Sequence, residues 1–322
     1  MDLDGHLLWD NHTYCAPVPG TATIDQLDRH RRAGFSVAFL NLGDADRSLE
    51  HVVRMAAFCR RWLKDHTDRF VLLQGLADVD DARRTGRLAV GFNVEGAFAI
   101  GDQLDAVSLL YDLGVRWMLL VYNRRNLAGS GVHDPVDQGL TPFGRRLAAE
   151  MDRVGMIKCV SHTGYRTALD VLDASQVPCI FSHSNALALK RHARNIPDEL
   201  IRACAATGGV VGINGLNIFL GDGGPEAALM ADHIDHVAQL VGIDHVGIGT
   251  DYGYMSAADI GDVLSDGAFW PNGHDYDKAI ECVPPEAIGD VVGCLEGKGY
   301  GPADIAKVLG GNMRRLAAAV WR

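Results

Sequence analysis

The sequence lacks several features that mark common functional classes. None of its seven cysteines is spaced as CxxC and their number is odd, so free thiols are expected rather than a disulfide framework. No run of about 18 apolar residues occurs, so we expect no membrane-spanning helix. No cluster of Lys and Arg stands out in a chain of net charge −11, which argues against nucleic acid or an anionic membrane as the main partner.

The amino-terminal segment, MDLDGHLLWD, has neither a basic stretch nor a long apolar one. Together with the scattered cysteines, this predicts no signal peptide and a reduced, cytoplasmic protein. What the chain does contain is a hydrophobic fraction of 48% over 322 residues, ample for a large core. No repeat or Pro/Ser-rich linker divides the sequence, so a single domain over residues 1–322 is expected.

The middle of the sequence holds its most informative pattern. Two short apolar segments, 157–160 and 178–181, are each followed by Ser-His, and residues 165–174 between them have apolar side chains at helical spacing. Parallel strands joined by a crossover helix place their carboxyl ends side by side. His162 and His183 are therefore expected to lie close enough to share a metal ion, because imidazole is a favoured zinc ligand. The alternative is that each histidine caps a strand end, but a matched pair favours the ligand role.

Strand and helix patterns alternate along the whole chain, and this alternation predicts a parallel sheet with helices outside it. The expected fold is α/β, a (β/α)8 TIM-type barrel with a metal site at the C-terminal ends of the strands. Nine strand segments are predicted, so one is either an edge strand or not a strand. They are 7–9, 36–42, 70–74, 88–94, 115–121, 157–160, 178–181, 209–213 and 244–249, with a long loop over 252–282 and three helices after it.

Two acidic residues follow predicted strands in the same way as the histidines. Glu95 ends LAVGFNVE, and Asp251 lies in VGIGTDYG. A carboxylate at such a place is costly to desolvate unless a metal or a cation holds it, although either residue could instead cap a turn. Four polar residues at four strand ends favour a metal site with a spare carboxylate for proton transfer.

These motifs resemble those of the membrane dipeptidase (renal dipeptidase) family of zinc metallopeptidases, within the amidohydrolase-like barrels. The resemblance rests on the paired Ser-His, on GLTPFG at 139–144, on RNIPD at 194–198 and on GIGTDYG at 247–253. It extends over most of the chain. It implies hydrolysis of a dipeptide or similar small amide with a free carboxylate by metal-activated water, and it implies a homodimer.

The resemblance also implies a role for each matching residue. Glu95 stands where a glutamate bridges two zinc ions, and His162 and His183 match the two histidines of one zinc site. Arg194 matches the arginine that binds the substrate's carboxylate, a task that suits its forked geometry. Asp251 matches the catalytic acid/base aspartate.

Two positions depart from the family pattern. The family's first strand carries His-x-Asp, whose histidine and aspartate bind the other zinc; here His12 matches the histidine, but Tyr14 replaces the aspartate. Neutral tyrosine is a poor zinc ligand, so one or two zinc ions per chain are expected. Cys15 could substitute, although strand alternation points it away from His12; Asp10 lies on the wrong side of His12 in sequence, and His6 fits less well.

The second departure is in YNRRN, where Tyr122 replaces the family's substrate-polarising histidine. A phenol can still donate a hydrogen bond to a carbonyl oxygen, so Tyr122 is expected to be catalytic and substrate-binding. Two other functions stay open. One is a single-metal amidohydrolase acting on N-acyl amino acids or lactams, and the other is a metal-poor barrel that binds an amino-acid-like ligand without turnover.

Overall fold

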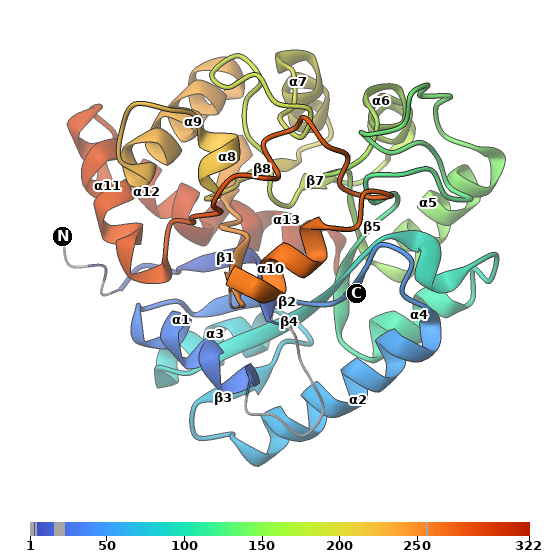
Figure 1. The fold of residues 1–322 in the computed structure, drawn as a ribbon. Coiled ribbons are helices and arrows are strands. Elements are labelled where there is room, and N and C mark those ends of the chain that lie inside the picture. The colour runs from blue at the N-terminus through green and yellow to red at the C-terminus, as the bar shows by residue number, and fades with distance from the viewer. Residues whose placement is uncertain (1–2, 4, 16–22, 256) are drawn as a thin grey trace.

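In the computed structural model, which describes residues 3, 5–15, 23–255 and 257–322, parallel strands form one sheet surrounded by helices (Figure 1). The sheet order is β10-β1-β2-β4-β5-β6-β7-β8-β9. A crossover helix between successive parallel strands produces this order. The strands are β1 (Trp9–Cys15), β2 (Val37–Asp44), β3 (Phe70–Leu72), β4 (Leu88–Glu95), β5 (Val115–Leu119), β6 (Ile157–Cys159), β7 (Ile180–Phe181), β8 (Val210–Ile213), β9 (Val246–Ile248) and β10 (Tyr252–Tyr254).

The sheet closes into a ring through residues 246–254. The first part of this stretch, β9, pairs with β8, and its last part, β10, pairs with β1. The ring therefore has eight positions, and the predicted (β/α)8 TIM-type barrel is confirmed. The additional predicted strand is real: β3 pairs with Leu88–Val90 of β4, just before the part of β4 that pairs with β5.

Helices cover the outside of the ring. In Figure 1, α4, α5, α6, α7 and α9 follow one another around the strands, from α4 at the right over the top to α9 at the upper left, with α11 at the left. The helices are α1 (Asp28–Arg32), α2 (Leu49–Asp65), α3 (Leu76–Thr85), α4 (Ala106–Asp112), α5 (Pro142–Val154), α6 (Tyr165–Ala174), α7 (Asp198–Ala206), α8 (Asn217–Leu220), α9 (Glu226–Val241), α10 (Ala257–Leu264), α11 (Ile288–Gly297), α12 (Pro302–Ala306) and α13 (Asn312–Val320).

The GLTPFG motif shows how local sequence sets an element. Thr141 caps α5 by accepting a hydrogen bond from the Gly144 amide at 3.0 Å, and Pro142 occupies the first helical position, where no amide hydrogen is needed. A side chain at Gly144 would lie 2.2 Å from the carbonyl oxygen of Ala128. The motif therefore starts α5 and packs it closely against the loop that follows β5.

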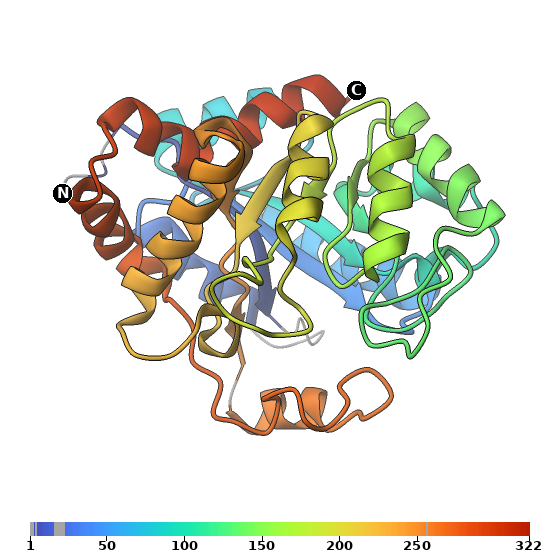
Figure 2. The same ribbon diagram turned by 90° about the horizontal axis from the view of Figure 1, so that it is seen from above.

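Two hydrophobic layers follow from the alternation of side chains along the strands. On β2, Val37 and Phe39 belong to an inner cluster with Trp117, while Ala38 and Leu40 belong to an outer cluster beneath the helices. Residues of α13 pack against the inner cluster at the amino ends of the strands. In Figure 2, α13 and α10 lie on opposite sides of the molecule, so the carboxyl ends of the strands open toward α10.

The structure corrects two predictions of local structure. The first strand is not confined to 7–9 but runs over Trp9–Cys15, because its polar residues are buried and bonded, as Asp10 is to Thr250. The predicted loop over 252–282 contains the strand β10 and the helix α10. Pairing with β1 makes 252–254 a strand, and that contact cannot be read from local periodicity.

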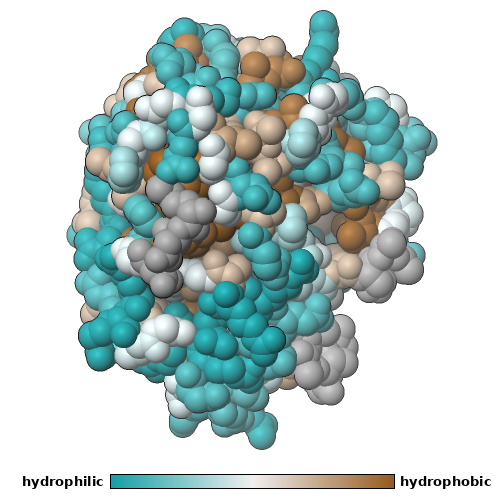
Figure 3. Space-filling model, turned by 90° about the vertical axis from the view of Figure 1, so that its left-hand side faces the viewer, coloured by the Kyte–Doolittle hydropathy of each residue, from teal (hydrophilic) through white to brown (hydrophobic). Residues whose placement is uncertain are grey.

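Figure 3 shows one face of the molecule, on which hydrophilic residues predominate and hydrophobic residues gather in smaller patches. Among the described helices, none is both long and apolar enough to cross a membrane.

Candidate metal centre and substrate cavity

A cavity of about 570 Å³ opens at the carboxyl ends of the strands. Every predicted site residue lines it except His183, which is buried directly beneath it beside His162. The lining includes His12, Tyr14, Asp44, Glu95, Tyr122, His162, Arg194, Leu216, Ile218, Phe219, Asp251, Tyr252, Met255, Ile260, Val263, Leu264, Trp270, Tyr276, Ile280 and Cys282.

His162 and His183 face each other, as the strand-helix-strand pattern predicts. Their Nε2 atoms are 2.9 Å apart, and β6 and β7 are paired through Cys159 and Ile180. His162 lies in the left-handed region, with φ of 60°, which turns its ring inward after β6 ends. Burial, with the nearby charge of Arg194, holds the pKa of His162 well below its usual value, so the ring is neutral.

The second nitrogen of each ring is already bonded. Nδ1 of His162 donates to the amide oxygen of Asn123 at 2.8 Å, and Nδ1 of His183 is 2.8 Å from the hydroxyl of Ser182. With its Nδ1 donating, Nε2 of His162 presents a lone pair toward Nε2 of His183. Two Nε2 atoms that face each other in this way are placed as two ligands of one ion require.

Glu95 lies between this pair and His12. Its Oε1 is 3.5 Å from Nε2 of His183, and its Oε2 is 3.6 Å from Nε2 of His12. Oε1 is buried with no hydrogen-bond partner among the described residues, while Asn41 donates to Oε2 at 3.3 Å. Burial raises the pKa of Glu95 to about 7, against the opposing influence of His12. A carboxylate with one oxygen toward each side suits a bridge between two ions.

Asp251 completes this group on the side of His12. Its Oδ1 is 3.3 Å from Nε2 of His12, and Asn214 donates to its Oδ2 at 2.9 Å. Burial opposes protonation of His12, but Glu95 and Asp251 outweigh burial and raise the pKa of His12 to about 9. A cation is therefore favoured at this position: either the proton on His12 or a metal ion in its place.

The donors present fit a divalent metal. His12, Glu95 and His183 offer ligand atoms within 4.8 Å of one another, all buried. With His162 they provide three imidazoles and one carboxylate, the ligand types that zinc prefers. We call these four residues the metal cluster.

The other candidate ligands near the start of the chain are Tyr14, Cys15, Asp10 and His6. Tyr14 lines the cavity, but burial raises the pKa of its phenol, which opposes ionisation. Cys15 points the other way, into the outer core, where burial raises the pKa of its thiol to about 12. Asp10 is occupied by Thr250 and His30, and His6 does not line the cavity.

Tyr122 and Arg194 lie at the border of the metal cluster. The ring of Tyr122 stacks on His162 with centroids 4.3 Å apart, and burial raises the pKa of Tyr122 so that its hydroxyl keeps its proton. Arg194 is only 4% exposed, and its Nε is without a hydrogen-bond partner among the described residues. A buried guanidinium with an unused donor calls for an anionic ligand.

Sequence reasoning missed several residues of the site. Asn41, Asn123, Asn214 and Ser182 orient the predicted residues through the hydrogen bonds given above. The available signal was their position at or just after the carboxyl end of a strand, shared with the residues they hold. Asp44, the last residue of β2, was missed although it has the same placement as Glu95, with which it is in register.

His133, in the loop that follows β5, is buried, with its Nε2 2.8 Å from the hydroxyl of Tyr276. The segment that follows α10 covers it, and the sequence places that segment more than a hundred residues away.

Comparison with known proteins agrees with this geometry. The family model described as membrane dipeptidase (peptidase family M19) matches residues 25–266, about three quarters of the chain. The chain belongs to the membrane dipeptidase family.

Among relatives, it is 30% identical to dipeptidase tcpJ of Claviceps purpurea over 85% of this chain, and 33% identical to dipeptidase verJ of Clonostachys rogersoniana over 70%. It spans only 60% and 57% of the lengths of those two proteins.

Two solved structures share the fold. An amidohydrolase from Pseudomonas aeruginosa superposes with a TM-score of 0.89 at 26% identity, covering 98% of this chain and 97% of that one. A metallopeptidase from Rhodobacter sphaeroides, bound to a phosphinate mimic of L-Ala-D-Ala, has a TM-score of 0.77 at 24% identity, covering 98% and 99%. Because the metallopeptidase is only 24% identical to this chain, its similarity is evidence for the fold alone.

Proposed function

We propose that this protein is a zinc-dependent hydrolase of dipeptides, or of closely related small amides that carry a free carboxylate. One observation carries the proposal: the metal cluster and Arg194 lie around the same cavity. Arg194 is buried, and its Nε has no hydrogen-bond partner among the described residues. One end of such a cavity suits a scissile amide, and the other suits a carboxylate. Family membership and the two relatives named dipeptidases support the same reaction.

Each residue has a task in this proposal. Zinc bound at the metal cluster would supply a Lewis acid that polarises the amide and lowers the pKa of an attacking water. Oδ1 of Asp251 accepts the proton of that water and delivers it to the leaving amine nitrogen, while Asn214 holds the other oxygen in place. The Tyr122 hydroxyl donates a hydrogen bond to the amide oxygen, and Arg194 orients the substrate through its carboxylate.

Asp44 favours a dipeptide over an N-acyl amino acid. It lies on β2 and Arg194 follows β7, the second and sixth of the eight ring positions, so the two line the cavity from opposite sides. Burial raises the pKa of Asp44, against the charge of Arg47. A dipeptide extends about 7 Å between its charged ends, and its ammonium group would neutralise this desolvated carboxylate. An N-acyl substrate has no such charge.

A substrate screen with a matched pair of variants tests the proposal. Zinc-loaded protein should cleave L,L- or L,D-dipeptides, and Asp44→Asn should lower kcat/KM for dipeptides by about 10-fold or more while leaving N-acyl amino acids unaffected. Asp46→Asn, which changes a nearby exposed carboxylate, is the control. If the protein cleaves N-acyl amino acids or lactams but no dipeptides, it is the single-metal amidohydrolase, the alternative that the tyrosine at position 14 favours. No turnover of any amide would point to the metal-poor binding protein.

Three further features belong to the proposal. The metal is zinc, with one tight ion and a weaker or empty second site, because Tyr14 stands in place of a carboxylate. The protein works in the cytoplasm as a homodimer, and the metal cluster and the cavity belong to one catalytic domain. Light scattering on the purified protein tests the dimer, and a monomeric mass would contradict it.

A further inference from the structure

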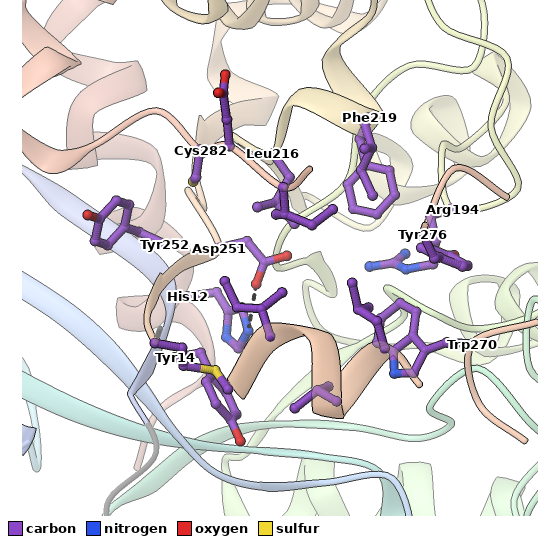
Figure 4. A pocket seen from close by; sticks show the side chains of 18 of the residues that line it. His12, Tyr14, Arg194, Leu216, Phe219, Asp251, Tyr252, Trp270, Tyr276 and Cys282 are labelled. Atoms are coloured by element: carbon purple, nitrogen blue, oxygen red, sulfur yellow. Dashed lines mark ion pairs between the residues drawn. The ribbon is translucent and has the colours of Figure 1, made fainter. Parts of the chain in front are cut away.

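Three aromatic residues gather around Arg194. Phe219 comes from α8, while Trp270 and Tyr276 come from the segment after α10. The guanidinium carbon of Arg194 is 5.6 Å from the centre of the Phe219 ring, and the rings of Trp270 and Tyr276 are 4.9 Å apart. Figure 4 shows Phe219, Trp270 and Tyr276 on the same side of the cavity as Arg194, with His12 and Asp251 across from them. We call these three residues the aromatic wall.

The aromatic wall is anchored to the site. The hydroxyl of Tyr276 is 2.8 Å from Nε2 of His133, so its one polar atom is used and its ring is left for contact. The backbone amide of Trp270 donates to the backbone carbonyl oxygen of Asp266 at 2.8 Å. Beside Trp270, the carbonyl of Phe269 accepts from Asn123 at 3.1 Å, and the same Asn123 holds His162. Asn123 therefore links the segment that carries Trp270 to His162 of the metal cluster, which sets the distance between the aromatic wall and the metal cluster.

The wall has no task in the reaction described above. Arg194 needs only its guanidinium to bind a carboxylate, and the metal cluster needs only polar neighbours. Large aromatic rings that line a cavity offer apolar surface, which binds an apolar side chain by removing it from water. The side chain nearest to Arg194 in a bound dipeptide belongs to the residue that carries the carboxylate.

We propose that Phe219, Trp270 and Tyr276 form a binding site for an aromatic or large aliphatic side chain on the carboxylate-bearing residue of the substrate. The substrate class is thereby narrowed to dipeptides that end in residues such as phenylalanine or leucine. This inference rests on the proposed function for the placement of the carboxylate at Arg194. The wall itself rests on the distances above.

Kinetics on paired substrates test the proposal. Wild-type protein should favour Ala-Phe, with L- or D-phenylalanine, over Ala-Gly by about 10- to 100-fold in kcat/KM. Phe219→Ala should lower kcat/KM for Ala-Phe by about 10-fold and change that for Ala-Gly by less than about 3-fold. Trp270→Leu should do the same. Phe98→Ala, which removes a ring that is 53% exposed, is the control and should change neither substrate. Equal kcat/KM for the two substrates, or equal loss on both in both variants, would overturn the proposal.

Binding measured without turnover separates this inference from the proposed function. In calorimetric titrations, L- or D-phenylalanine should bind wild-type protein at least about 10-fold more tightly than glycine, and Phe219→Ala should reduce that difference. Preferential phenylalanine binding without cleavage of any dipeptide would support the aromatic wall and refute the proposed function. Cleavage of dipeptides without any preference for phenylalanine would refute the aromatic wall alone.

Discussion

Arg194 is a buried cation, and an anionic ligand would offset the free-energy cost of its desolvation. Replacing it by methionine keeps much of the apolar stem and removes the charge, so folding should survive while carboxylate recognition is lost. We expect Arg194→Met to reduce kcat/KM for free dipeptides by about 2–5 kcal/mol in transition-state stabilisation.

The matched control is Arg191→Met, which changes an exposed arginine three residues away. Dipeptide amides, which lack the carboxylate, should lose little in the Arg194 variant. An equal loss on free and amidated substrates would show that Arg194 supports the fold rather than the substrate.

At Tyr14 a single residue decides whether the metal sites are equal. With Asp251 used for proton transfer, the second ion has only His12 and Glu95 as protein ligands, fewer than the three usual for catalytic zinc. We therefore expect one tight and one weak zinc in calorimetric titration of the wild type, and a tighter second site in Tyr14→Asp.

Cys15→Ala is the control for that experiment, because the thiol points into the core and should contribute nothing to metal affinity. Two equally tight sites in the wild type would refute the expectation, and their loss in Cys15→Ala would identify the thiol as a ligand.

Among the elements, β1 and the stretch 246–254 depend on one buried carboxylate. Asp10 accepts hydrogen bonds from the Thr250 amide at 2.9 Å and the His12 amide at 3.2 Å, and it lies 3.0 Å from Nε2 of His30. It closes the ring and places both His12 and the residue before Asp251.

Removing this carboxylate leaves several buried groups without a partner. Asp10→Ala should lower the free energy of unfolding by about 3–5 kcal/mol, measured by urea denaturation. Asp65→Ala, which changes an exposed carboxylate at the end of α2, should alter it by less than about 0.5 kcal/mol. A change below about 1 kcal/mol at Asp10 would show that strand pairing alone closes the ring.

For the molecule as a whole, buried neutral histidines couple stability to acidity. Burial, with Arg194 nearby, lowers the pKa of His133 to about 3, and burial is also the main cause that lowers the pKa of His192 to about 4. Both are depressed below the unfolded value near 6.5. Below about pH 6.5 the unfolded chain therefore binds more protons than the folded protein does. The contribution of His133 and His192 to the free energy of unfolding is full above about pH 6.5 and is lost as the pH falls toward about 4.

The corresponding measurement is thermal unfolding in the presence of a chelator, so that zinc binding does not contribute. The fall in Tm between about pH 7 and about pH 4.5 should be smaller in His192→Gln than in wild type, and unchanged in His6→Gln. Identical pH dependence in wild type and His192→Gln would mean that His192 takes up its proton in the folded state as readily as in the unfolded chain.

The sequence by itself determined the barrel and the polar ends of its strands. Apolar segments of strand length alternate with segments whose apolar residues recur at helical spacing, and few folds other than a parallel β/α fold accommodate this alternation. Parallel strands bring their carboxyl ends to one rim of the sheet. The end of each strand can be recognised from nearby residues in the sequence. The sequence therefore predicts one shared site, without any long-range contact being known, for Glu95, His162, His183 and Asp251.

Only the tertiary structure decided which residues support that site and what surrounds it. The aromatic wall meets the rest of the site across gaps of tens to more than a hundred residues, and no local pattern distinguishes Phe219, Trp270 and Tyr276 from other aromatic residues. The bounds of β1 depend likewise on Asp10 meeting Thr250, 240 residues later. The periodicity of helices and strands reflects contacts between near neighbours in sequence, whereas strand pairing and the enclosure of a cavity depend on residues that folding brings together from distant parts of the chain.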